Sequence, residues 1–359
     1  MARIFNFSAG PSALPQEVLE QAQAELLDYQ STGMSVMEMS HRSDVFVGIA
    51  SRAEADFRDL LGVSDNYHVL FLQGGATTQF ASIPLNLTQV GDTVDYLDTG
   101  AWSSKAVKEA AKYCHVNVVA SGKSGNYSSI PDVAQWRHGN NARYLHICSN
   151  ETIGGVQFKQ FPNVSVPLVA DMSSDFLSRP VDVDRFAVIY GGAQKNIGPA
   201  GLTLVVVRKD LCGSARVETP GTLDFAVQAG ADSMSNTPPT FAWYLAGLVF
   251  EWLKNLGGLP GINEINERKA AKLYDTIDAS DFYQSPVEAS VRSTMNVPFT
   301  MPKPELDKLF VSGAEAIGLS GLKGHRSVGG MRASLYNAVP EAAVDALISF
   351  MNEFEHEHG

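Results

Sequence analysis

Seven short apolar segments, rich in β-branched residues and spaced roughly 20 to 25 residues apart, constrain the fold of this chain most strongly. Most lack strict alternation of apolar and polar residues, which indicates strands covered on both faces. Helical segments such as 103–113 separate several of them, a pattern typical of parallel strands joined by crossover helices. The last two segments lie too close together for a helix, so we expect that pair to be antiparallel. The pattern predicts an α/β fold with a mostly parallel seven-stranded sheet, whose strands are 69–72, 94–97, 116–120, 144–148, 168–171, 187–190 and 202–207.

Helical spacing of apolar residues predicts two helices before the sheet, over 14–29 and 46–60. After the sheet, Pro238 and Pro239 suit the first turn of a further helix, with Thr237 as its N-cap. Gly257 and Gly258 then indicate the end of that helix. The remaining predicted elements are a helix over 262–277, a strand over 295–299, a helix over 306–317, a strand over 331–336 and a helix over 340–354.

These elements divide the chain into two predicted domains. We expect a large α/β domain over residues 13–257 and a smaller α+β domain over residues 258–359. Residues 1–12 are expected to pack beside the small domain.

The charge balance limits the classes of partner. Lys and Arg number 27 and Asp and Glu number 39, for a net charge of −12. This balance argues against general binding of nucleic acid or anionic membrane, but a local arginine cluster could still bind a small anion. Residues 1–9 lack signal-peptide features, and the longest apolar run, Phe241–Phe250, is too short to span a bilayer. The widely spaced Cys114, Cys148 and Cys212 suit neither a disulfide framework nor a zinc site, so we expect a cytoplasmic protein without metal.

Lys195 is the most informative single residue. It lies in a glycine-rich turn between two apolar strands, where desolvation would favour the neutral, nucleophilic amine that a Schiff base requires. A solvated loop lysine is the alternative. Asp171 ends a predicted strand, where parallel sheets bind ligands, and could pair with a pyridinium nitrogen. The alternative for Asp171 is a helix N-cap.

Other strand ends carry weaker signals. Residues 73–78 join a strand to a helix through small residues, so their N–H groups could face an anion. Trp102 could stack on a flat ring and Thr152 could donate its hydroxyl, although core packing is the usual role of a tryptophan. Basic residues cluster in 41–42 and 325–332, where arginines could bind carboxylate or phosphate or could simply be solvated.

Five stretches, taken together, resemble one family. They are 5–11 (FNFSAGP), 37–43 (MEMSHRS), 73–77 (QGGAT), 193–201 (AQKNIGPAG) and 324–334 (GHRSVGGMRAS). The sequence resembles the phosphoserine aminotransferase family, fold-type I pyridoxal phosphate enzymes within the class V aminotransferases. The last stretch is the most specific, because relatives of other activity share the lysine turn.

The resemblance implies one pyridoxal 5'-phosphate per subunit, held as a Schiff base on Lys195. It implies that the other cofactor contacts are Gly75, Ala76, Trp102, Thr152, Asp171 and Gln194, together with Asn236 and Thr237 reaching the cofactor phosphate of the neighbouring subunit. Such an arrangement implies a homodimer with shared active sites. The implied substrate-binding residues are His41, Arg42, His325, Arg326 and Arg332.

The activity implied is reversible amino transfer from glutamate to 3-phosphooxypyruvate, giving phosphoserine and 2-oxoglutarate for serine biosynthesis, with phosphohydroxythreonine for pyridoxine biosynthesis as a further product. Another class V activity, such as serine–glyoxylate or alanine–glyoxylate transamination, is the alternative, and it would need no phosphate site. A cysteine desulfurase would need a mobile nucleophilic cysteine. A catalytically silent binding protein on the same scaffold would bind no cofactor covalently.

Overall fold

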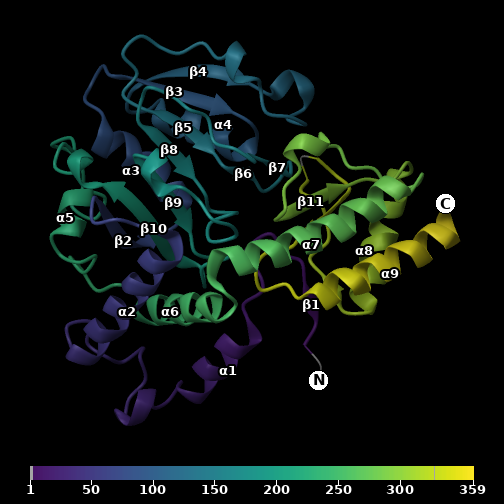
Figure 1. The fold of residues 1–359 in the computed structure, drawn as a ribbon, viewed down its shortest axis with the longest axis horizontal. Helices are drawn as coiled ribbons and strands as arrows, with labels where there is room; N and C mark the ends of the chain where they lie inside the picture. The colour runs from purple at the N-terminus through teal and green to yellow at the C-terminus, as the bar shows by residue number, and fades with distance from the viewer. Residues whose placement is uncertain (1–2, 327) are drawn as a thin grey trace.

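Seven strands form the central sheet of the computed structural model, which describes residues 3–326 and 328–359 (Figure 1). Their order across the sheet is β2-β10-β9-β8-β5-β3-β4. The five strands from β9 to β4 pair in parallel, whereas β10 is antiparallel to both β9 and β2. The prediction of a mostly parallel α/β sheet with an antiparallel last pair is confirmed. The strands are β2 (Tyr67–Gly74), β3 (Thr93–Asp98), β4 (His115–Ser121), β5 (Leu145–Cys148), β8 (Leu168–Asp171), β9 (Val188–Gly192) and β10 (Gly201–Arg208).

Helices cover both faces of this sheet, which explains why its strands read as unbroken apolar runs. Phe80 and Ala106, from α3 and α4, pack on one face with the side chains of Tyr96 and Tyr190. On the other face, Trp243 of α6 stacks on Phe71 of β2 with ring centroids 4.4 Å apart. The helices of this part are α2 (Asp44–Leu61), α3 (Ala76–Leu87), α4 (Ala101–Ala110), α5 (Phe225–Ala229) and α6 (Thr240–Asn255).

A second core is built from both ends of the chain. Strand β1 (Phe5–Asn6) pairs in parallel with β12 (Leu319–Ser320), and Phe7 is fully buried among the apolar side chains of this core. The antiparallel pair β11 (Asn296–Phe299) and β13 (Met331–Ser334) lies beside it. The long helices on this side of the molecule are α7 (Gly258–Ala279), α8 (Asp307–Ala316) and α9 (Glu341–His358) (Figure 1).

A buried lysine joins α7 to the loop between β13 and α9. Lys269 is fully buried, and its ammonium donates to the backbone carbonyls of Leu335 (3.0 Å), Tyr336 (2.9 Å) and Val339 (3.0 Å). Three carbonyl oxygens accept from all three N–H bonds of the ammonium, although burial lowers the pKa of Lys269 to about 7.

Two predicted helix boundaries are wrong. The first helix is only α1 (Gln16–Ala24), because Tyr29 lies in a separate 3₁₀ turn and is buried edge-on against Tyr244, with ring centroids 5.8 Å apart. Helix α6 begins at Thr240 after Pro239, so Thr237 is not its N-cap; its carbonyl accepts a hydrogen bond from Gln73 instead.

Candidate active site

A cavity of about 280 Å³ lies at the carboxyl ends of β5 and β8. The N-terminal residues Ala9 and Gly10 also line it, together with side chains from loops that follow the strands. Nine of the residues predicted from the sequence meet here: Gly75, Ala76, Trp102, Thr152, Asp171, Gln194, Lys195, His325 and Arg332. Residues far apart along the chain therefore form one cavity, as the parallel strand order requires.

Lys195 lies in the turn between β9 and β10, and its side chain is buried (7% exposed). Its Nζ donates to Oγ1 of Thr152 at 2.7 Å. Burial lowers the pKa of the Lys195 ammonium to about 8, although the negative charge of Asp171 opposes this shift. Lys195 is thus not the solvated loop lysine of the alternative interpretation, and it can present a neutral amine near physiological pH.

The N-terminal segment holds the Lys195 turn in place. The hydroxyl of Ser12 donates to the carbonyl of Lys195 at 2.7 Å, and its N–H donates to the carbonyl of Gln194 at 3.0 Å. A Cβ at Gly10 would lie 3.5 Å from the side chains of both Gln194 and Lys195. The two chain segments are therefore in van der Waals contact at the cavity.

Asp171 ends β8 and is buried (5% exposed). Its Oδ1 accepts hydrogen bonds from the N–H (2.9 Å) and the hydroxyl (2.6 Å) of Ser173, while Oδ2 has no donor among residues 3–326 and 328–359. Burial raises the pKa of Asp171, and the bonds from Ser173 oppose the rise. A protonated ring nitrogen would supply the missing partner, since it brings a donor and a positive charge to a buried carboxylate.

The turn from β2 into α3 presents backbone donors to the cavity. Gly74 has a φ of +108°, which favours glycine, and Gly75 is the N-cap of α3. Gly75, Ala76 and Thr77 line the cavity, so the positive end of the helix dipole faces it. A phosphate group fits this helix N-terminus.

Two further donors in the cavity have no partner within the described part of the chain. The indole Nε1 of Trp102 and the Nε of Arg332 are both buried and unbonded, although Nη1 of Arg332 donates to the carbonyl of Thr152 at 3.4 Å. The Lys195 Nζ lies 5.8 Å from the centroid of the Trp102 ring. Amine, carboxylate, helix N-terminus and unsatisfied donors together fit pyridoxal phosphate with an anionic substrate.

The remaining five predicted site residues do not line this cavity. Arg326 is exposed beside Ser327, which lies outside the described residues. His41 and Arg42 directly precede α2, and the exposed Asn236 and Thr237 precede α6. The two helices start side by side, since Phe46 near the start of α2 contacts Trp243 near the start of α6 with ring centroids 6.1 Å apart. These two pairs thus precede adjacent helix starts, and the carbonyl of Thr237 accepts from Gln73, two residues before Gly75 of the cavity wall.

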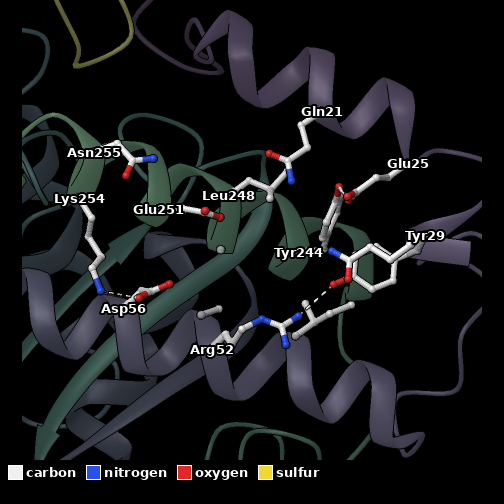
Figure 2. A pocket seen from close by; sticks show the side chains of 14 residues that line it. Gln21, Glu25, Tyr29, Arg52, Asp56, Tyr244, Leu248, Glu251, Lys254 and Asn255 are labelled. Carbon is white, nitrogen blue, oxygen red and sulfur yellow. Dashed lines mark hydrogen bonds and ion pairs between the residues drawn. The ribbon is translucent and has the colours of Figure 1, made fainter.

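A larger cavity of about 450 Å³ lies between α1, α2 and α6 (Figure 2). Four of its five charged groups bond to groups on neighbouring elements: Lys254 to Asp56 at 2.8 Å, Arg52 to the hydroxyl of Tyr29 at 2.9 Å, and Glu25 to the hydroxyl of Tyr244. These contacts join helices, so this cavity is the weaker candidate for chemistry.

Residues 3–326 and 328–359 include no helix long and apolar enough to cross a membrane. Over the same residues, no group of three His, Cys, Asp or Glu side chains could hold a metal ion. The three cysteines are free, and burial raises the pKa of the Cys148 thiol, which lines the cavity.

Sequence reasoning missed three residues of the site. Ser173 holds Asp171, Lys105 lies with its Nζ 4.1 Å from the centroid of the Trp102 ring, and Glu151 bonds to the backbone of Trp102. The spacing Trp102–Lys105 on a helix could have indicated that contact. Nothing in the sequence could indicate the partner of Glu151, which lies 49 positions away.

Comparison with known proteins shows the family of this chain. A family model described as aminotransferase class-V matches residues 4–347. The chain therefore belongs to the class-V aminotransferase family, and it is a pyridoxal phosphate-dependent transaminase.

Within that family, similar proteins at 42–62% identity are phosphoserine aminotransferases. The phosphoserine aminotransferase of Hahella chejuensis is 62% identical over 353 residues and aligns over 98% of both chains. The structure of phosphoserine aminotransferase from Bacillus circulans subsp. alkalophilus superposes with a TM-score of 0.97 at 49% identity, covering 99% of both chains. The pyridoxal phosphate-bound phosphoserine aminotransferase of Trichomonas vaginalis superposes with a TM-score of 0.95 at 42% identity, covering 98% of this chain and 100% of that one. These findings confirm the resemblance seen in the sequence.

Proposed function

We propose that this transaminase transfers the amino group of L-glutamate to 3-phosphooxypyruvate, giving O-phospho-L-serine and 2-oxoglutarate in serine biosynthesis. Formation of 4-phosphohydroxy-L-threonine in pyridoxine biosynthesis is part of the same proposal. The observation that carries it is the buried Lys195 amine, which shares one cavity with Asp171 and Arg332. The names of the relatives support the choice of substrate.

One pyridoxal phosphate per subunit would be held by residues from separate elements. Lys195 would bind it covalently, Asp171 would pair with its ring nitrogen, and the N-terminus of α3 would bind its phosphate. Trp102 would cover the ring, and Thr152 and Gln194 would contact its edge. When bound, this group supplies an aldehyde that links to amines and a ring that withdraws electrons.

Lys195 would also move the proton. Its amine, whose pKa burial lowers to about 8, would accept the α-proton of the substrate as a base and then return a proton as an acid. The hydroxyl of Thr152 orients the amine at 2.7 Å, and the burial of Lys195 keeps bulk water from the proton in transit.

Two kinds of cation would hold the substrate. Arg332, half-buried at the cavity wall, suits bidentate binding of the carboxylate, with His325 beside it. Arg326, His41 and Arg42 would bind the phosphate group. Because His41 and Arg42 do not line the cavity of their own chain, we place them in the site of a second subunit, which makes the active form a homodimer.

Asn236 and Thr237 would reach the partner's cofactor phosphate in the same way. They are exposed and precede α6, whose start is adjacent to that of α2, which follows His41 and Arg42. One dimer interface would thus bring both pairs to the partner's cavity.

The rival functions lack this support. Another class V transaminase would need no phosphate-binding cations, and the curated relatives at 57–62% identity are phosphoserine aminotransferases. A desulfurase needs a mobile thiolate, whereas Cys148 is buried with a raised pKa and its Sγ bonds to the carbonyl of Asn150 at 3.4 Å.

A half-reaction scan tests the proposal. The enzyme loaded with pyridoxamine phosphate is mixed with single keto acids, and recovery of the pyridoxal form is followed by absorbance. We expect 3-phosphooxypyruvate and 2-oxoglutarate to react fastest. A preference for glyoxylate or pyruvate would contradict the proposed substrate, and a protein that stays colourless with pyridoxal phosphate would contradict the enzyme class.

A further inference from the structure

The carboxylate of Glu151 is a buried charge that the proposed function does not use. Glu151 ends the short strand β6 (Asn150–Glu151), which pairs with β7 (Val156–Gln157), and it is fully buried (0% exposed). A buried carboxylate persists only where donors satisfy its oxygens, so its partners indicate what it does.

Both oxygens of Glu151 bond to the first turn of α4. Oε2 accepts from the backbone N–H of Trp102 at 3.0 Å, and Oε1 accepts from the N–H of Ser103 at 2.9 Å. The first N–H groups of a helix have no partner within the helix. The glutamate thus acts as an N-terminal cap supplied by a distant segment, and its charge also complements the helix dipole.

Gly100 makes this contact possible. A Cβ at position 100 would lie only 2.5 Å from the Cδ of Glu151 and 2.6 Å from its Oε2. Any side chain there would push the carboxylate away from α4. The close approach of Glu151 to α4 therefore depends on a glycine at position 100.

The capped turn carries a residue of the cavity. Trp102 is the second residue of α4, and its indole lines the cavity with Nε1 buried and unbonded within the described residues. The next residue after Glu151 is Thr152, which bonds to the amine of Lys195. The same loop thus fixes the backbone under Trp102 and the orientation of Lys195.

We propose that Glu151 is a positioning residue: by capping α4, it fixes the indole of Trp102 in the orientation that covers the cofactor. This inference rests on the proposed function, which places Trp102 against the ring of pyridoxal phosphate. Glu151 itself touches neither cofactor nor substrate in this account.

The direct test is Glu151→Gln. Glutamine keeps the shape of the side chain but has only one oxygen that can accept a hydrogen bond. Its amide N–H₂ would face a backbone N–H, so the first turn of α4 loses one charge-assisted bond and gains a repulsive contact. We expect the Kd of the cofactor-free protein for pyridoxal phosphate to rise about tenfold, measured by quenching of tryptophan fluorescence. Gly100→Ala should reproduce this loss from the opposite side of the contact.

A double-mutant cycle separates positioning from general structure. If Glu151 acts through Trp102, Glu151→Gln should change the Kd less than about twofold in a Trp102→Phe background, read from cofactor absorbance. Glu109→Gln on the same helix is the matched control, because Glu109 bonds to Lys112 at the far end of α4. Its Kd should stay within about twofold of wild type.

Thermal melting of the cofactor-free variants shows which are folded, and Glu151→Asp replaces Glu151→Gln if that variant does not fold. The inference is overturned if the folded variant binds within about twofold of wild type, or if the loss persists unchanged in the Trp102→Phe background. A wild-type protein that bound no pyridoxal phosphate would instead refute the proposed function.

Discussion

Lys195 keeps one fixed hydrogen-bond acceptor, Thr152, inside a buried cavity. A lysine in water would have many acceptors and a pKa near its ordinary value. Replacing Lys195 by alanine should therefore abolish turnover and the visible absorbance of bound pyridoxal phosphate, because Lys105, the other lysine that lines the cavity among the described residues, is exposed. A fully active Lys195→Ala variant would contradict the assignment of Lys195. Lys105, which also lines the cavity, gives the control variant Lys105→Ala, which should keep the absorbance.

The lowered pKa of Lys195 also has a consequence for stability. In the folded chain Lys195 loses its proton at a pH of about 8, whereas in the unfolded chain it keeps the proton up to its ordinary pKa of 10.5. Between these two pH values, the unfolded chain therefore binds one proton more than the folded chain. Stability of the cofactor-free protein should therefore rise with pH in this window through Lys195, by about 1.4 kcal/mol per pH unit.

Lys195→Met should lose this contribution, since methionine has no proton to exchange. Urea unfolding of wild type and variant at several pH values between 8 and 10.5 measures the difference in slope. Other titrating groups cancel in that comparison. Equal slopes would show that the ammonium is not destabilised in the fold.

At the scale of the elements, strands were predicted well and helix ends poorly. Six of the seven strands are mostly buried, and packing on both faces explains the apolar runs that locate them. In the edge strand β4 only Val119 is buried, and its β-branched residues locate it. The end of α1 has no such signal, because Tyr29 continues the apolar stripe while packing separately against Tyr244. Thr237 was predicted as the N-cap because it directly precedes Pro238 and Pro239. Helix α6 begins only at Thr240, and Pro239 is its N-cap.

The residues of the candidate site also differ in how far the sequence alone could predict them. Asp171 is the last residue of β8 and Lys195 comes three residues after the end of β9, so the parallel order brings them to one edge of the sheet. The contact of Glu151 with α4 joins two segments that lie 49 positions apart, so no local sequence pattern could predict it. The roles of His41 and Arg42 depend on a second subunit, and they stay predictions.

Helix α7 gives a test at this scale. Lys269→Met should lower the free energy of unfolding by about 3 kcal/mol, because it leaves three buried carbonyls without donors. Urea unfolding measures the change. Lys272→Met on the same helix is the control: its ammonium bonds to the exposed Asp345, and its loss should matter far less. Similar losses for both variants would contradict the role of the three carbonyls.

At the scale of the whole molecule, shared active sites predict complementation. Lys195→Ala and Arg42→Ala should each be nearly inactive as separate proteins. If Arg42 serves the partner's cavity, unfolding and refolding the two together should restore about a quarter of wild-type activity, because half of the dimers are mixed and each mixed dimer has one intact site. Activity of the refolded mixture is the measurement.

A matched mixture controls that experiment. Lys195 and Asp171 line the same cavity within one chain. Co-refolding Lys195→Ala with Asp171→Asn should therefore restore nothing. Recovery in this control, or none with Arg42→Ala, would contradict the shared site.

The pairing of β1 with β12 limits when the N-terminal segment can reach its folded position during translation. Phe5 lies opposite Leu319, so Phe5 cannot pair in this sheet until Leu319 has been made. At the usual pace of translation, that wait is on the order of tens of seconds. Because Ser12, a few residues further along, donates to the carbonyl of Lys195, the segment that lines the cavity is held at both of these points only after Leu319 has been made.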